Sequence, residues 1–117
     1  MTSELLLNLN TINELKDMLE ENFTELFTVF KDNSREHIEQ LKIAHAENNI
    51  DDVFKYTHIL KGSCGSLGLT GIYDFMNDLE TCLREDKNAD VTSSMLELES
   101  LYSATLNALV DNGFLAT

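Results

Sequence analysis

The stretch Tyr56-Thr57-His58-Ile59-Leu60-Lys61-Gly62-Ser63-Cys64-Gly65-Ser66-Leu67-Gly68 is the part of the sequence from which the fold is best predicted. It contains one of the three histidines and three of the five glycines of the 117-residue chain. Two of the eight cationic side chains also belong here, because Lys55 lies just before the stretch and Lys61 lies inside it. This concentration of histidine, lysine and glycine indicates a functional site.

The apolar spacing of this stretch predicts a helix over residues 51–67. Successive intervals of four, three, four and three residues, typical of one helix face packed in a bundle, separate Val53, Thr57, Leu60, Cys64 and Leu67. At about 100° per residue, His58 points roughly 140° away from the centre of that face. We therefore expect its imidazole to face water.

The predicted neighbours of His58 suit an anionic group and a close approach by another protein. The same exposed side of the helix carries Phe54, Lys55, Lys61, Gly62 and Gly65. The lysines disfavour protonation of the imidazole, which is nucleophilic when neutral, and they can bind phosphoryl oxygens. Each glycine costs about 1 kcal/mol in a helix interior, so we interpret the two as clearance for a partner. Phe54 suits a core position and a docking contact equally well, and Lys55 suits phosphate support and simple solvation equally well.

The sequence from Thr57 to Glu80 resembles the motif of histidine phosphotransfer (HPt) domains. The family pattern is a small residue, His, any residue, Leu, Lys, Gly and Ser, followed by a glycine-rich turn and a helix that ends in Leu-Glu. Here the pattern is matched by His58, Leu60, Lys61, Gly62, Ser63, Gly65, Leu67, Gly68, Ile72, Phe75, Met76, Leu79 and Glu80. Thr57 and Leu69 depart from it, since the family usually has alanine at both positions.

The resemblance implies a phosphorelay intermediate in two-component signal transduction. A response-regulator receiver domain would supply the aspartyl phosphate and the Mg²⁺, and His58 would carry the phosphoryl group as a phosphohistidine to another receiver aspartate. Lys61, with Lys55 as a second candidate, would support the phosphoryl oxygens, while Gly62 and Gly65 would admit the receiver's loops. A hybrid sensor histidine kinase is a further candidate partner. We expect no ATP-dependent kinase activity, because the chain has no nucleotide-binding motif.

The whole sequence predicts an all-α protein with a single domain over residues 1–117. We expect an up-down antiparallel four-helix bundle with a short additional N-terminal helix. Residues 1–10 are expected to be a loose segment whose leucines cover one end of the core. A capping box formed by Thr11 and Glu14 then opens the short helix.

The main helices are expected over residues 23–48, over 51–67, from Thr70 to about residue 84, and from about residue 92 to Asn112. Whether the polar residues 32–34 kink the first of these helices stays open. Gly68 and Gly71 are expected to close the second helix and turn the chain, with Thr70 as the N-cap of the third.

Composition excludes several classes of partner. The formal net charge of −13 argues against nucleic acid and against anionic membrane surfaces, since both require a basic face. No apolar run of about eighteen residues and no signal peptide is present, so we expect a cytoplasmic protein. The initial methionine and a whole bundle within 117 residues favour a free-standing protein over a domain of a hybrid kinase, and we expect a monomer because the apolar helix faces are used up inside one bundle. Cys64 and Cys82 are expected to be buried free thiols.

Two alternatives come from other functional classes. The first is a helical module that regulates a receiver or a kinase by binding alone, which would still act when His58 is replaced. The second is a metal-binding bundle, which is disfavoured because the cysteines and histidines form no closely spaced ligand pairs. We therefore expect no metal site, and we expect His37 and His45 to be solvated or at the edge of the core.

Overall fold

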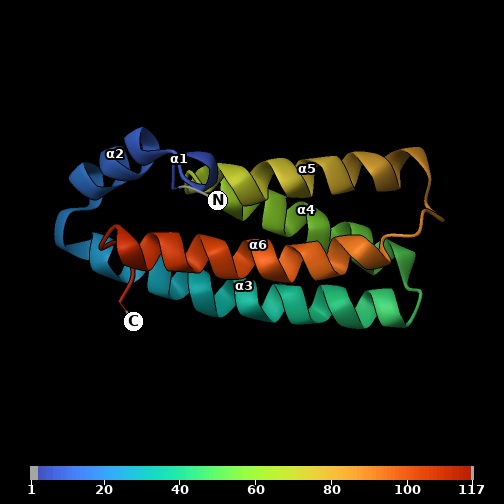
Figure 1. Ribbon diagram of the computed structural model, residues 1–117. Coiled ribbons are helices and arrows are strands. Elements are labelled where there is room, and N and C mark those ends of the chain that lie inside the picture. Colours follow the sequence, from blue (N-terminus) through green and yellow to red (C-terminus); the bar gives the residue numbers. More distant parts are fainter. Residues whose placement is uncertain (1–2, 117) are drawn as a thin grey trace.

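The computed structural model describes residues 3–116, which form an elongated bundle measuring 44 × 23 × 22 Å (Figure 1). Its elements are α1 (Ser3–Leu6), α2 (Leu9–Leu19), the 3-10 helix η1 (Glu20–Asn22), α3 (Phe23–Ala46), α4 (Ile50–Ser66), α5 (Thr70–Glu85) and α6 (Thr92–Asp111). Helices α3 to α6 run alternately up and down, and α1 and α2 lie at one end of the bundle (Figure 1). The predicted all-α bundle is confirmed.

Helix α3 is continuous over its 24 residues, so the polar residues 32–34 do not split it. Ser34 is buried, and its hydroxyl lies 2.7 Å from the hydroxyl of Tyr102 in α6. The Tyr102 hydroxyl also donates to the carbonyl oxygen of Lys31 at 3.1 Å. The polar residue is thus satisfied across the helix pair, so it does not break α3.

An ion cluster stabilises the same pair of helices closer to the surface. Glu99 of α6 accepts hydrogen bonds from Arg35 at 2.8 Å and from Lys42 at 2.9 Å, both in α3. Hydrogen bonds from these two cations lower the pKa of the Glu99 carboxyl group to about 2. Glu99 therefore stays ionised across the whole neutral and mildly acidic range.

The N-terminal segment is more ordered than predicted. Residues 1 and 2 lie outside the described part, but residues 3–6 are helical and α2 begins at Leu9. The predicted capping box is wrong, because the Oδ1 atom of Asn8 accepts a hydrogen bond from the Thr11 N–H at 3.1 Å and caps the helix earlier. The Asn8 N–H in turn donates to the Gly68 carbonyl oxygen at 2.7 Å.

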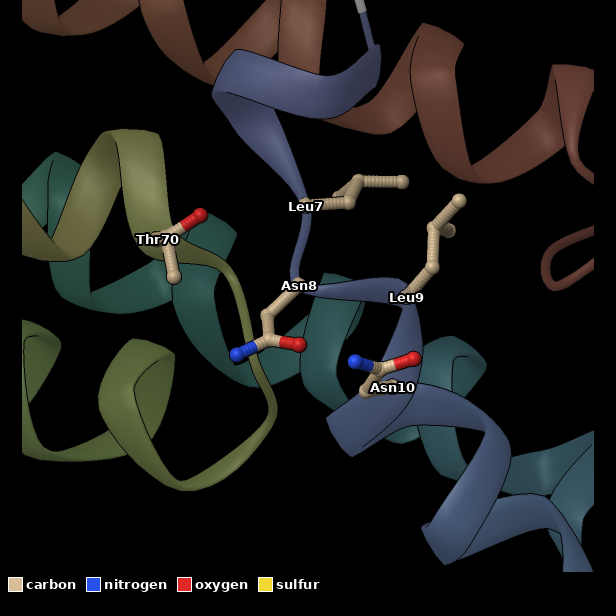
Figure 2. A pocket seen from close by; sticks show the side chains of 5 residues that line it. All are labelled: Leu7, Asn8, Leu9, Asn10 and Thr70. Atoms are coloured by element: carbon tan, nitrogen blue, oxygen red, sulfur yellow. The ribbon is translucent and has the colours of Figure 1, made fainter.

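This junction joins the N-terminal segment to the turn between α4 and α5. Figure 2 shows Asn8 beside that turn, with Thr70 at the start of α5 across a small pocket. Leu6 and Leu7 are buried against the bundle, as expected of the leucines, whereas Leu5 is exposed. One end of the core is therefore covered by two leucines rather than three.

The turn after α4 depends on one glycine, not on two. Gly68 has φ +75°, in the left-handed region that favours glycine. Gly71 lies inside α5, where a Cβ atom would sit 3.0 Å from the carbonyl oxygen of Leu5, so its role is to let α1 approach. Thr70 is the first residue of α5, and the N-cap position belongs to Leu69. The predictions that Gly71 helps to close α4 and that Thr70 is the N-cap of α5 are therefore wrong.

The core is built as the apolar spacing predicts. The buried face of α4 consists of Val53, Thr57, Leu60 and Cys64. Leu67 is half-buried at the end of this face. Cys82 is exposed, so the prediction of two buried thiols is wrong for this residue; the buried positions of α5 next to it are Leu79 and Leu83. No helix in the described part of the chain is both long enough and apolar enough to cross a membrane.

Candidate functional site

His58 lies on the outer surface of α4, and 65% of its side chain is exposed. The structure therefore places the ring where the helix period predicts it. The ring also contacts the neighbouring helix, because its Nδ1 atom lies 2.9 Å from the Oε2 atom of Glu80 in α5. Glu80 itself is 2% exposed, so an almost fully buried carboxylate supports an exposed imidazole.

Glu80 is the common partner of three side chains around this site. Besides the contact with His58, its Oε1 atom accepts hydrogen bonds from Lys61 at 3.2 Å and from Arg84 at 2.6 Å. Burial raises the pKa of the Glu80 carboxyl group, but the hydrogen bonds from His58 and Lys61, with the Lys61 charge, outweigh burial and bring the pKa below its ordinary value. Glu80 is therefore an anion at neutral pH.

The ionised state of Glu80 fixes the roles in its contact with His58. A carboxylate can only accept a hydrogen bond, so the proton in this contact belongs to Nδ1 of the imidazole. A neutral imidazole has one N–H group, and when that proton is on Nδ1 the lone pair is on Nε2. In the neutral ring of His58, the lone pair is therefore on Nε2.

The structure separates the two lysines that the sequence placed near His58. Lys61 is only 22% exposed and is paired with Glu80, so its charge is balanced within the cluster. Lys55 is exposed, and its ammonium group lies 5.1 Å from the ring centroid of Tyr56. Lys61 therefore belongs to the His58 cluster, and the contact recorded for Lys55 is with Tyr56.

The two glycines near His58 have different surroundings. A Cβ atom at Gly62 would meet nothing within 4 Å, so the helix surface is open there. A Cβ atom at Gly65 would lie 2.9 Å from Cδ2 of Tyr73 in α5. The ring of Tyr73 thus flanks Gly65, which is nevertheless exposed, so the clearance interpretation stays a prediction for both glycines.

Phe54 combines the two roles that the sequence left open. It is half-buried against the core, and the guanidinium carbon of Arg84 lies 5.8 Å from its ring centroid. The ring also lines a small groove between α4 and α5, together with Ile50, Asp51, Leu83, Arg84 and Lys87. Phe54 therefore joins the core to the surface next to the His58 cluster.

Two residues of the cluster were missed as site residues in the sequence. Glu80 was part of the family motif but had no role assigned to it, and Arg84 was not singled out. Arg84 follows Glu80 by four residues, which is the spacing of ion pairs on one helix face. The contact between Arg84 and Glu80 could have been predicted from this spacing.

The other candidate ligands do not assemble into a site. His37 is half-buried with its ring 6.1 Å from that of Tyr56, and His45 is half-buried at the end of α3. Within residues 3–116, no three His, Cys, Asp or Glu side chains are grouped so that they could hold a metal ion.

Comparison with known proteins identifies the family. The sequence model of the Hpt domain matches residues 25–112, a range that runs from α3 through α6 and includes His58. The chain therefore belongs to the Hpt domain family. No curated protein and no solved structure matches it. Hpt domains act in histidine phosphotransfer in phosphorelays, have no kinase activity of their own and typically interact with response-regulator receiver domains.

Proposed function

We propose that this chain is a phosphorelay intermediate in which His58 accepts a phosphoryl group from the aspartyl phosphate of one receiver domain and passes it to an aspartate of another. The single observation that carries this proposal is the hydrogen bond between Nδ1 of His58 and the buried Glu80 carboxylate. It supports an exposed ring with its lone pair on Nε2, which is what an incoming phosphorus atom requires.

The transfer needs no proton to leave the imidazole. The Nε2 lone pair attacks the phosphorus in line, the bond from phosphorus to the aspartate oxygen breaks, and the aspartate leaves as a carboxylate. The ring keeps its Nδ1 proton and becomes positively charged. Glu80 is already in contact with that proton, so its negative charge stabilises the product. Donation to the second receiver reverses these steps.

Two cations that contact Glu80 are suited to stabilise the transferred phosphoryl group. Lys61 and Arg84 both donate to the Glu80 Oε1 atom, and Arg84 is 64% exposed. A phosphoryl group on Nε2 would bring about two negative charges, which Lys61 and Arg84, held against the same carboxylate as His58, would attract. Lys55 is a further candidate for this role, and Gly62 and Gly65 would admit the receiver's loops.

We also propose that the protein works as a cytoplasmic monomer and that the Mg²⁺ required for transfer belongs to the receiver. The charge of −13 supports a soluble partner rather than an anionic lipid surface or nucleic acid. A hybrid sensor histidine kinase, whose own receiver domain would be the donor, is the candidate upstream partner.

The test follows labelled phosphate from a radiolabelled receiver to the wild-type protein and to His58→Gln. We expect label on the wild type from the receiver and none from ATP alone, with the acid-labile, alkali-stable behaviour of phosphohistidine. His58→Gln should take no label and should keep its helical circular dichroism, because the ring is exposed. His37→Gln is the matched control and should be labelled like the wild type.

Two outcomes would contradict the proposal. Labelling of His58→Gln would place the phosphoryl group elsewhere. Failure of the wild type with receivers that transfer to other Hpt proteins would favour the regulatory binding module, which the retained binding of His58→Gln to a receiver would then support.

A further inference from the structure

A second surface feature lies between α5 and α6, away from the His58 cluster. It is a groove of about 550 Å³ whose lining consists of Phe75, Leu96, Glu97, Ser100, Leu101 and Ala104. Arg84, which belongs to the His58 cluster, follows Phe75 by nine residues and therefore points about 180° away from it around α5. The groove and the His58 cluster thus lie on opposite sides of the same helix.

The groove is mostly apolar, and part of its apolar lining faces water. Leu96 is 72% exposed at its edge, although leucine gains free energy when it is covered. Phe75 is half-buried beside it and packs on the core from the other wall. A single exposed leucine needs no explanation, but an exposed leucine over an apolar groove is typical of a docking surface.

The charges around the groove have one sign. Helix α6 contains no lysine, arginine or histidine, and Arg84 is the one cationic residue in the sequence of α5. Arg84 is engaged with Glu80 on the far side. By contrast, Glu97 lines the groove, and the exposed Asp78 follows Phe75 by three residues on the same side of α5.

We propose that this groove binds a cationic amphipathic helix of a partner protein, with its apolar residues on Leu96 and Phe75 and its lysines or arginines toward Glu97 and Asp78. The two antiparallel helices α5 and α6 form the walls of an apolar groove, which suits a third helix laid between them. Charge complementarity selects a basic occupant. A second copy of this chain, at −13, or an anionic lipid surface would instead be repelled.

The proposal does not depend on phosphotransfer. Because the groove and the His58 cluster occupy opposite sides of α5, a partner in the groove leaves the imidazole accessible. The protein could therefore be held by one partner while a receiver meets His58.

The experiment uses a synthetic peptide of about fifteen residues, with leucines on one helical face and lysines on the other, and an otherwise identical peptide with glutamates in place of lysines. Binding to the whole protein is measured by titration at physiological ionic strength, where charges beyond about 8 Å are screened. Amide chemical shifts locate the bound peptide. We expect shifts at Phe75, Leu96 and Ala104 from the lysine peptide and no binding of the glutamate peptide.

Two pairs of variants make the test specific. Leu96→Ser should raise the Kd about tenfold, whereas Met18→Ser, at an equally exposed position in α2, should change it less than about twofold. Glu97→Lys should raise the Kd at least about fivefold, whereas Glu36→Lys, an exposed position in α3 with the same change in net charge, should change it less than about twofold. A difference within each pair separates local contacts from general attraction to an acidic protein.

Three outcomes would overturn the proposal. The first is equal loss of affinity in both members of each pair, and the second is absence of binding at millimolar peptide. The third is self-association of the wild type that Leu96→Ser abolishes, which would make a second copy the occupant.

Discussion

The Nδ1 atom of His58 and the Oε2 atom of Glu80 lie 2.9 Å apart, although one side chain is mostly exposed and the other is almost completely buried. The exposed His58 ring is thus oriented by a carboxylate that is almost completely buried beneath it. If His58 is the phosphoacceptor, the bundle already orients the ring, and a partner need only bring the phosphorus to Nε2.

Replacing Glu80 by glutamine should affect both the stability and the chemistry. The neutral amide keeps the shape of the side chain but removes the charge that Lys61 and Arg84 share, so we expect a loss of about 1–3 kcal/mol in the free energy of unfolding. Phosphoryl transfer to His58 should slow by about tenfold, because the positive ring of the product loses its counter-charge. Urea unfolding and single-turnover labelling measure the two effects.

Glu97→Gln is the control for this experiment, because it removes an exposed carboxylate that does not contact the cluster. A transfer rate in Glu80→Gln equal to that of the wild type would show that Glu80 supports the fold alone.

Because of the ion cluster around Glu99, part of the free energy of unfolding should depend on pH in the acidic range. Its pKa is about 2 in the folded protein against an ordinary value of 4.5, so the unfolded chain binds this proton more readily. The stabilising contribution is fully present above pH 4.5 and is lost as the pH falls toward 2. Glu99→Gln should therefore be less stable than the wild type at pH 7, and the gap should narrow by pH 3. Urea unfolding at both pH values tests this, and a gap that does not change with pH would disprove it.

The two glycines should respond differently to alanine. Gly62→Ala should stabilise the protein by about 1 kcal/mol, because the position is open and alanine is the better helix former. Gly65→Ala should gain less or lose stability, because the ring of Tyr73 must move from a contact at 2.9 Å. In a Tyr73→Ala background the Gly65 substitution should become favourable. Thermal unfolding of the wild type, the two single variants and the double variant completes this cycle, and an equal effect of Gly65→Ala in both backgrounds would refute the packing argument.

The two cysteines should differ in reactivity toward a thiol reagent. Burial raises the pKa of the Cys64 thiol to about 12, and the thiolate is the reactive form, whereas Cys82 is exposed. We expect one thiol per chain to react in the native protein and the second only after unfolding. Cys82→Ser should show no native reaction, and rapid labelling of that variant would contradict the buried position of Cys64.

Most of the fold could be predicted because the apolar residues follow one period. The positions of Val53, Leu60 and Cys64 gave the buried face of α4, and this face placed His58 outside. The residues at which the helices begin and end were harder to predict. Asn8 and Thr11 are both good caps, and the observed choice accompanies a hydrogen bond from Asn8 to Gly68, which is distant in the sequence.

The partners of the site residues could not be predicted in the same way. Which carboxylate of α5 meets His58 depends on how that helix is rotated against α4, and local spacing does not specify this. For the same reason the proximity of Tyr73 to Gly65 was not predicted, and Cys82 was placed in the core. Contacts between helices are the information that the periodic pattern lacks.

The convergence of His58, Lys61 and Arg84 on one carboxylate also has a genetic consequence. Replacing Glu80 releases all three side chains at once, whereas replacing either cation leaves the other in place. If His58 carries the phosphoryl group, a screen of random mutants for lost signalling should yield changes at codon 80 as well as at codon 58. Alleles at codon 80 should be partial and alleles at codon 58 null.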